Sequence, residues 1–217
     1  MKSTLEAVWE HREEVVYPRL FGPKARGIFA LDFDLFKNIF KQESVDPRWL
    51  FYGVLEHGPT GSGTYHYVTS GASNPWEVEP QDYAKQEFSG LGTELVLETL
   101  DSADWPIVVL QRLLAFNILL AHGRYGDSKP LDYWHRVPLG GSMTRDSVLR
   151  HLLIAPPDGY PAQFSLASGR VDLLHVVGIT EKERDYGKAH GSEALLKLLK
   201  GHGAFPVTDP DRTCIAP

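Results

Sequence analysis

The sequence predicts an α+β fold in which a mixed β-sheet has helices packed against it. Three observations support this: several runs alternate apolar and polar residues with a period of two, one long apolar segment has helix-type boundaries, and two short helical segments end the chain. The hydrophobic fraction is 42% and the charged fraction 23%, close to globular averages. No linker or repeat interrupts the chain, so we expect one domain spanning residues 1–217.

The first elements are predicted to be a helix and a strand. Residues 4–17 carry a partial apolar stripe of helical spacing, and Pro18 is expected to end that helix. In residues 27–36, Phe, Leu, Phe and Leu alternate with polar or small residues, which is typical of a half-buried strand.

A hairpin and a further strand follow. Residues 49–56 and 64–70 are rich in aromatic and β-branched side chains, and the glycine-rich residues 57–63 separate them. Residues 70–75 combine glycine with Asn-Pro and predict a tight loop. Residues 92–100 alternate again and predict the next strand.

The middle of the chain predicts a buried helix. Pro106 suits the first position of a helix that runs to residue 121 and is closed by Gly123. Apolar side chains cover most of its circumference, so we expect it to lie between layers. The turn-rich stretch after it holds two short strand candidates, residues 132–137 and 148–154.

The C-terminal part predicts a second hairpin and two helices. Residues 162–166 and 171–179 form the hairpin, and the second arm is apolar enough to be a central strand. A helix after residue 180 and another over residues 193–200 then complete the chain. Their predicted boundary residues are Thr180 and Glu183 as a capping box, Ser192 as the second cap and Gly201 as the stop.

Charge and composition exclude several classes of function. The formal net charge of −6 argues against nucleic-acid binding, and it is compatible with a basic protein partner or with solubility alone. The chain start lacks an apolar signal segment, and the longest apolar run, residues 107–120, is too polar to span a membrane. A single cysteine, Cys214, allows no internal disulfide and fits a reducing compartment. We therefore expect a cytoplasmic protein.

No recognised catalytic pattern is present. The glycine-rich residues 58–63 lack the Gly-Lys-Ser/Thr ending of a phosphate-binding loop, and no Gly-x-Ser-x-Gly occurs. The nine histidines are scattered, with no His-x-x-x-His pair, and carboxylates two residues apart are common on solvated strands. We expect no catalytic residue, cofactor or bound metal. The alternative is a small hydrolase whose histidine and carboxylate are brought together by folding.

Two tryptophans stand at the starts of predicted elements. Trp105 precedes the long helix and Trp134 lies in a strand candidate. Tryptophans at such places usually anchor the core, and we expect this of both. The alternative is an aromatic anchor at a recognition surface.

Six short motifs occur in one order from about residue 49 to the C-terminus. They are Tyr65 to Pro75, Gly90 to Leu95, Trp105-Pro106, Trp134-His135 with Pro138-Leu139, Leu174 to Ile179, and Val207 to Asp209 before Arg212. Together they resemble the suppressor of fused domain family, whereas residues 1–48 diverge from it. The resemblance implies an α+β domain with a mixed sheet and no known catalytic activity.

The resemblance also implies a function. Animal members bind and restrain zinc-finger transcription factors of the Hedgehog pathway by gripping a short peptide as an added strand. Bacterial members are proposed to be immunity proteins that neutralise toxins. The animal protein clamps its peptide against a second lobe, and this chain ends near the end of the first. We therefore expect a stand-alone, short bacterial-type member that binds and inhibits another protein or an extended peptide, with a toxin domain as one candidate.

The family's peptide-facing strand lies just upstream of Trp134-His135 and corresponds here to about residues 129–133, and the strand candidate based on it spans residues 129–135. Pro130 stands where the animal protein has an acidic residue, and a family tyrosine on the preceding helix is replaced by Phe116. We expect the strand edge to accept a partner segment, with flanking acidic residues steering a basic partner. The predicted partner-binding residues are Phe116, Asp127, Asp132, Tyr133, Trp134 and His135.

Overall fold

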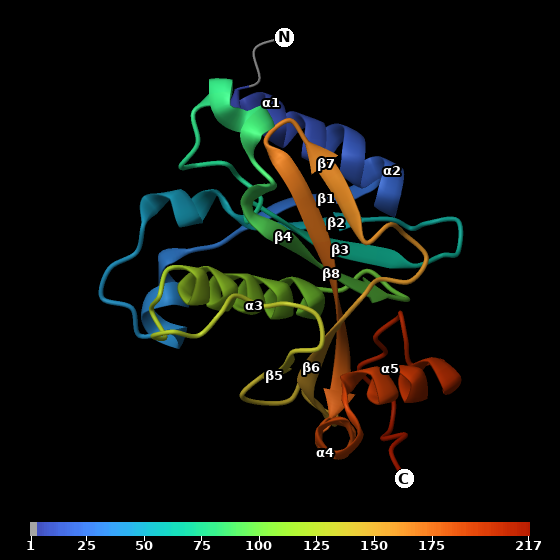
Figure 1. Ribbon diagram of the computed structural model, residues 1–217. Helices are drawn as coiled ribbons and strands as arrows, with labels where there is room; N and C mark the ends of the chain where they lie inside the picture. The colour runs from blue at the N-terminus through green and yellow to red at the C-terminus, as the bar shows by residue number, and fades with distance from the viewer. Residues whose placement is uncertain (1–3) are drawn as a thin grey trace.

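The computed structural model describes residues 4–217 and confirms the predicted mixed sheet with packed helices; the sheet has eight strands, and helices lie on both of its faces (Figure 1). The strands are β1 (Lys24–Ala30), β2 (Gly53–His57), β3 (Tyr65–Ser70), β4 (Phe88–Thr99), β5 (Arg136–Pro138), β6 (Leu149–Ala155), β7 (Gln163–Leu166) and β8 (Gly169–Thr180). The helices are α1 (Leu5–Glu10), η1 (His11–Val16), α2 (Tyr17–Phe21), η2 (Leu35–Ile39), η3 (Pro47–Phe51), η4 (Pro80–Lys85), α3 (Trp105–Ala121), α4 (Glu181–His190) and α5 (Ser192–Gly201).

Strand β8 is an interior strand that pairs with three others, β4, β6 and β7. The strand order is β1-β2-β3-β4-β8-β6-β5, and β7 pairs with the start of β8. The pair β4–β8 is parallel, and every other named pair is antiparallel. Strands β1 and β5 lie at the two ends of this order and are therefore edge strands.

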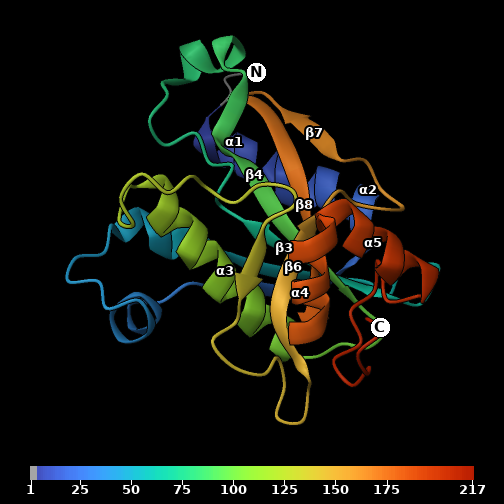
Figure 2. The same cartoon turned by 60° about the horizontal axis from the view of Figure 1, so that its bottom comes forward.

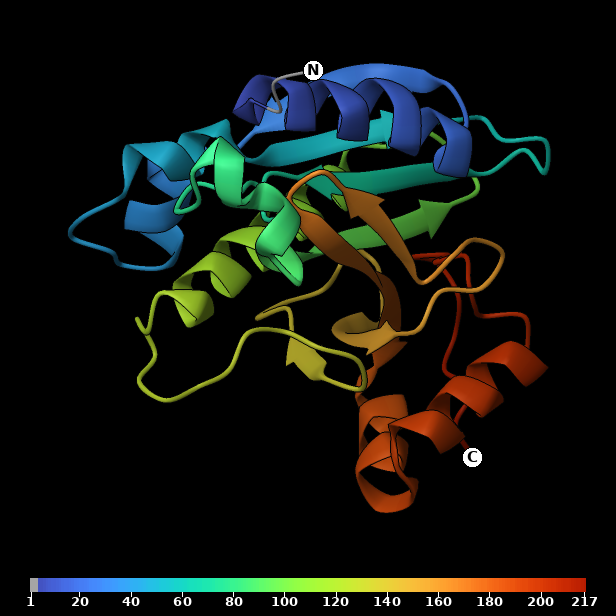
Figure 3. The same cartoon turned by 45° about the horizontal axis from the view of Figure 1, so that its top comes forward.

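The two faces of the sheet are covered by different helices. Helix α3 packs on one face against alternate residues such as Leu95, Leu152 and Leu174. The N-terminal helices cover the opposite face, with Val96 and Leu173 beneath them, and α4 and α5 cover the same face farther along β6 and β8. Figure 3 shows α3 and the N-terminal helices on opposite sides of the sheet, and Figure 2 shows α4 and α5 in front of β6 and β8.

The N-terminal helix does not end at Pro18, contrary to the prediction. A wider π-helical turn, η1, interrupts it, and the Tyr17 N–H there bonds to the carbonyl of Arg12, five residues earlier. Pro18 then lies at the start of α2, where a missing N–H costs little. The helix continues to Phe21 and ends at Gly22, whose φ of 84° suits glycine.

The predicted strand over residues 27–36 is wrong in its second half. Strand β1 ends at Ala30, and the chain turns into η2. The Asp32 carboxylate accepts a hydrogen bond of 2.7 Å from the Leu35 N–H, and this local bond favours a helical turn. Phe33, predicted to face the core, is 45% exposed.

Most other elements confirm the predictions, with shifted ends. In the predicted capping box, the Thr180 hydroxyl accepts from the Glu183 N–H at 3.2 Å, and the Glu183 carboxylate accepts from the Thr180 N–H at 2.8 Å. Ser192 is not a cap: Gly191 takes that position, and the Ser192 hydroxyl donates to the carbonyl of Trp134. The expected start of the first hairpin at Trp49 is helical turn η3 instead.

The two predicted tryptophan anchors are only half-buried. Trp105, the first residue of α3, packs against the core cluster between α3 and the sheet, and Trp134 packs against the cluster under α4 and α5. The fully buried tryptophan is Trp49, which is 2% exposed and lies between Phe36 and His122.

Candidate protein-binding groove

A groove of about 570 Å³ lies between α3 and the edge strand β5. Its lining combines one face of α3, the loop after that helix, β5 and part of η2. The lining residues are Ile39, Phe40, Val109, Arg112, Leu113, Phe116, Leu120, Tyr125, Ser128, Lys129, Leu131, His135, Arg136, Val137, Pro138, Leu139 and Leu152.

Helix α3 forms the apolar wall of the groove. Val109, Leu113, Phe116 and Leu120 recur at spacings of three and four residues, which places them on one helix face. The ring of Phe116 lies 5.5 Å from that of Tyr125, measured between centroids. These side chains can receive apolar groups of a ligand.

Strand β5 forms the opposite wall and leaves one backbone edge free of the sheet. The Ile154 N–H donates to the carbonyl of His135 at 2.9 Å, and the Leu139 N–H donates to that of Arg150 at 2.9 Å. In an antiparallel ladder the bonded positions alternate, so the N–H and C=O of Arg136 point away from β6. The β5 edge therefore offers main-chain groups to an incoming strand.

The predicted strand over residues 129–135 is absent. Only Arg136–Pro138 pair regularly with β6, because Tyr133 and Trp134 form a turn and Trp134 has a positive φ of 74°. An irregular bond still joins this turn to β6, since the Trp134 N–H donates to Ile154 at 2.7 Å. The free edge thus begins just after the predicted segment.

The structure brings two of the six predicted partner-binding residues into the groove. Phe116 lines the α3 wall, and the exposed His135 lines the β5 wall. Asp127 and Asp132 are exposed on the connecting loop but do not line it. The Asp132 carboxylate instead accepts a hydrogen bond of 2.7 Å from the Tyr133 N–H.

The other two predicted residues point away from the groove lining. The Tyr133 hydroxyl donates to the carbonyl of Leu173 on β8 at 3.1 Å, and burial raises the pKa of Tyr133 to about 12. Trp134 packs on the other face of the sheet, against the α5 cluster. Both side chains thus contact the sheet, one on each face, and neither belongs to the groove lining.

Sequence reasoning missed most of the groove wall. Val109, Leu113, Val137 and Leu139 line it, and none was among the predicted partner-binding residues. The spacing of Val109, Leu113 and Phe116 was a usable signal, but α3 is apolar on most sides, so spacing alone does not distinguish the open face from the buried one.

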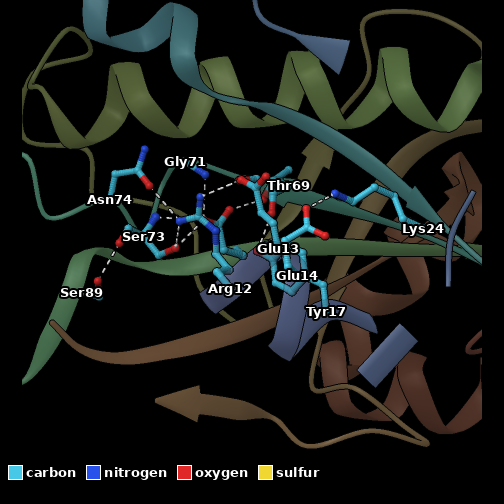
Figure 4. A network of polar contacts seen from close by, with 12 residues as sticks. Arg12, Glu13, Glu14, Tyr17, Lys24, Thr69, Gly71, Ser73, Asn74 and Ser89 are labelled. Carbon is cyan, nitrogen blue, oxygen red and sulfur yellow. Dashed lines mark hydrogen bonds and ion pairs between the residues drawn. The ribbon is translucent and has the colours of Figure 1, made fainter. Parts of the chain in front are cut away.

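The loop over residues 70–74, in the motif from Tyr65 to Pro75, has a structural role, which Figure 4 shows. The guanidinium of Arg12, on the N-terminal helix, is 1% exposed. It donates to Ser70 at 2.6 Å, Ser73 at 2.9 Å and Asn74 at 2.8 Å. The motif loop therefore holds a helix that lies outside the resembling region.

Glu94, from the Gly-Leu-Gly-x-Glu-Leu motif, completes this network. Its carboxylate accepts from the N–H groups of Gly71 at 3.1 Å and Ser73 at 2.9 Å, and from the Thr69 hydroxyl at 2.5 Å. Burial raises the pKa of Glu94, and Arg12, 3.8 Å away, opposes the shift. Hydrogen bonds in the core thus join the motif that contains Glu94 to the motif that contains Thr69, Gly71 and Ser73.

A histidine and a carboxylate do meet, as the hydrolase alternative requires, but in the interior. His66 Nε2 lies 3.5 Å from Glu98, and the exposed fraction of each residue is 6%. Burial lowers the pKa of His66 to about 4 and raises that of Glu98. Nearby, the Tyr160 hydroxyl donates to His175 Nδ1 at 2.8 Å, and His175 Nε2 donates to Pro206. A substrate reaches these groups only if the core opens.

Over residues 4–217, no group of three or more His, Cys, Asp or Glu side chains is arranged to hold a metal ion. Within the same described part of the chain, no helix has the length and apolar character needed to cross a membrane.

The fold and the groove define a class: a mixed-sheet α+β domain with an apolar groove beside a free strand edge. Residues 50–213 match the family described as Suppressor of fused protein (SUFU), and the chain belongs to this family. No curated protein sequence gave a significant match.

Solved structures of the family share the fold. A Sufu–Fu complex structure contains a chain with a TM-score of 0.67 and 18% identity, covering 99% of this chain and 93% of that one. A SUFU homologue from Neisseria gonorrhoeae has a TM-score of 0.56 and 18% identity, with coverages of 85% and 94%. For Drosophila Suppressor of Fused the TM-score is 0.59 and the identity 18%, with 76% of this chain covered. This chain spans only 42% of that Drosophila chain.

Proposed function

We propose that this protein is a non-catalytic interaction domain that binds an extended segment of another protein along the β5 edge. The observation that carries the proposal is the free backbone edge at Arg136, beside an apolar groove. A segment added as a strand would satisfy these main-chain groups and place alternate side chains in the groove. A chain of similar fold occurs in the Sufu–Fu complex, which supports a protein partner.

We further propose that binding inhibits the partner, as an immunity protein inhibits a toxin. The resemblance to bacterial family members supports this proposal. The net charge of −6 disfavours nucleic acid as the partner, and the free thiol of Cys214 fits a reducing compartment such as the cytoplasm. The hydrolase alternative gains no support from the geometry, because its His66–Glu98 pair is buried.

Photo-crosslinking in the native host tests the proposal. A photo-reactive amino acid replaces His135, which is exposed and lines the groove. The matched control carries it at Lys197, which is exposed on α5, across the sheet from α3. Capture of one protein from the His135 position and not from Lys197 is the expected result. Capture of that protein from Lys197 alone would place the binding surface elsewhere.

A further inference from the structure

The groove lining contains basic side chains and no acidic ones. Arg112, Lys129, His135 and Arg136 belong to the lining, and no aspartate or glutamate does. This contrasts with the whole chain, in which 28 acidic residues outnumber 22 arginines and lysines. The groove is therefore a local exception to the acidic character of the protein.

Two of these cations have no side-chain partner in the part of the chain that the structure describes. Arg112 and Lys129 are exposed, and among residues 4–217 neither forms a side-chain hydrogen bond or an ion pair. Arg136 differs, because its guanidinium donates to Ser192. His135 is also engaged, since its Nδ1 accepts from the Asp132 N–H at 3.2 Å. The charges free to meet a ligand are those of Arg112 and Lys129.

Arg112 occupies the junction of three hollows. It lines the groove, a hollow of about 300 Å³ beside Trp105 and Met143, and another of about 300 Å³ against η2. Asp32 and Asp34 line the last of these, yet neither makes an ion pair with Arg112. A ligand that runs along α3 from the groove into either neighbouring hollow passes this guanidinium.

We propose that the segment bound in this groove is acidic and apolar: it carries aspartate or glutamate side chains that pair with Arg112 and Lys129. This inference rests on the proposed function and names the chemistry of its partner. Arginine pairs with carboxylates through two parallel hydrogen bonds, and apolar surroundings strengthen such pairs. The sequence-based expectation was a basic partner steered by Asp127 and Asp132, but these two lie outside the lining.

A displayed library of random ten-residue peptides tests the partner chemistry. Peptides selected on the parent protein are resynthesised, labelled and titrated against Arg112→Glu/Lys129→Glu. The control is Arg19→Glu/Lys197→Glu, which changes the net charge equally at exposed residues on α2 and α5. Crosslinking from the photo-reactive residue at position 135 shows whether each peptide lies in the groove.

The expected peptides crosslink at position 135 and are enriched in Asp, Glu and apolar residues. Their affinity should fall by about tenfold or more in the groove variant, change by less than about twofold in the control, and weaken as salt rises. Two results would overturn the inference without contradicting the proposed function: groove peptides that are rich in Lys or Arg, or groove peptides whose affinity is the same for the parent and for Arg112→Glu/Lys129→Glu. If no selected peptide crosslinks at position 135, the proposed function and the inference both fail.

Discussion

Replacing Arg12 by methionine tests whether the N-terminal helix belongs to the cooperative domain. The change deletes hydrogen bonds to Ser70, Ser73 and Asn74 and leaves the buried carboxylate of Glu94 without its cation. Removing one partner of a buried ion pair costs about 3–5 kcal/mol. A domain is typically stable by about 5–15 kcal/mol, so the loss should be plain in unfolding curves.

Urea unfolding of four proteins measures the effect: the parent, Arg12→Met, Glu94→Gln and the double variant. Because the two groups share one network, the double variant should lose less stability than the two single losses combined, by about 1–3 kcal/mol. If Arg12→Met unfolds within about 1 kcal/mol of the parent, or the losses simply add, the network does not hold the helix to the sheet.

Two further predictions concern pH and the core. Burial lowers the pKa of His66 and of His175 from 6.5 to about 4. At pH values between 4 and 6.5 the unfolded chain therefore binds more protons than the folded protein. Stability should therefore fall as pH drops from 6.5 to 4, by roughly 3 kcal/mol per histidine, with the raised pKa of Glu98 opposing part of the loss. Urea midpoints that stay constant over this window would contradict the assignment. Trp49→Ala should cost about 3–5 kcal/mol and Trp105→Ala less than about half of that, because Trp49 is fully buried. Equal losses in urea unfolding would refute this ranking.

The correct predictions concern elements that neighbouring residues in the sequence define on their own. The hairpin of β2 and β3 and the apolar run of β8 combine strand residues with turn residues, and both formed. The failures also have local causes. A hydrogen bond from the Leu35 N–H to the Asp32 carboxylate favours a helical turn in part of a predicted strand, and a π turn carries the first helix past Pro18.

The groove could be predicted only in part, because it depends on tertiary structure. The predicted strand, residues 129–135, lies next to the edge strand in the chain, but the free edge itself is at Arg136–Pro138. Nothing in the sequence around Tyr133 shows that its hydroxyl reaches β8. Likewise, the open face of α3 is set by what packs on the other faces, so Arg112 carries no sequence signal of its own.

One comparison tests the central claim most directly: the affinity of the crosslinked partner for Arg136→Pro and for Arg136→Ala. Both variants lose the side chain and its bond to Ser192, and only proline removes the outward N–H of the β5 edge. If the partner adds a strand to this edge, proline should weaken binding by about tenfold relative to alanine, consistent with one lost main-chain hydrogen bond of about 1 kcal/mol and crowding by the ring. Equal affinity of the two folded variants would show that the β5 edge is not the binding surface.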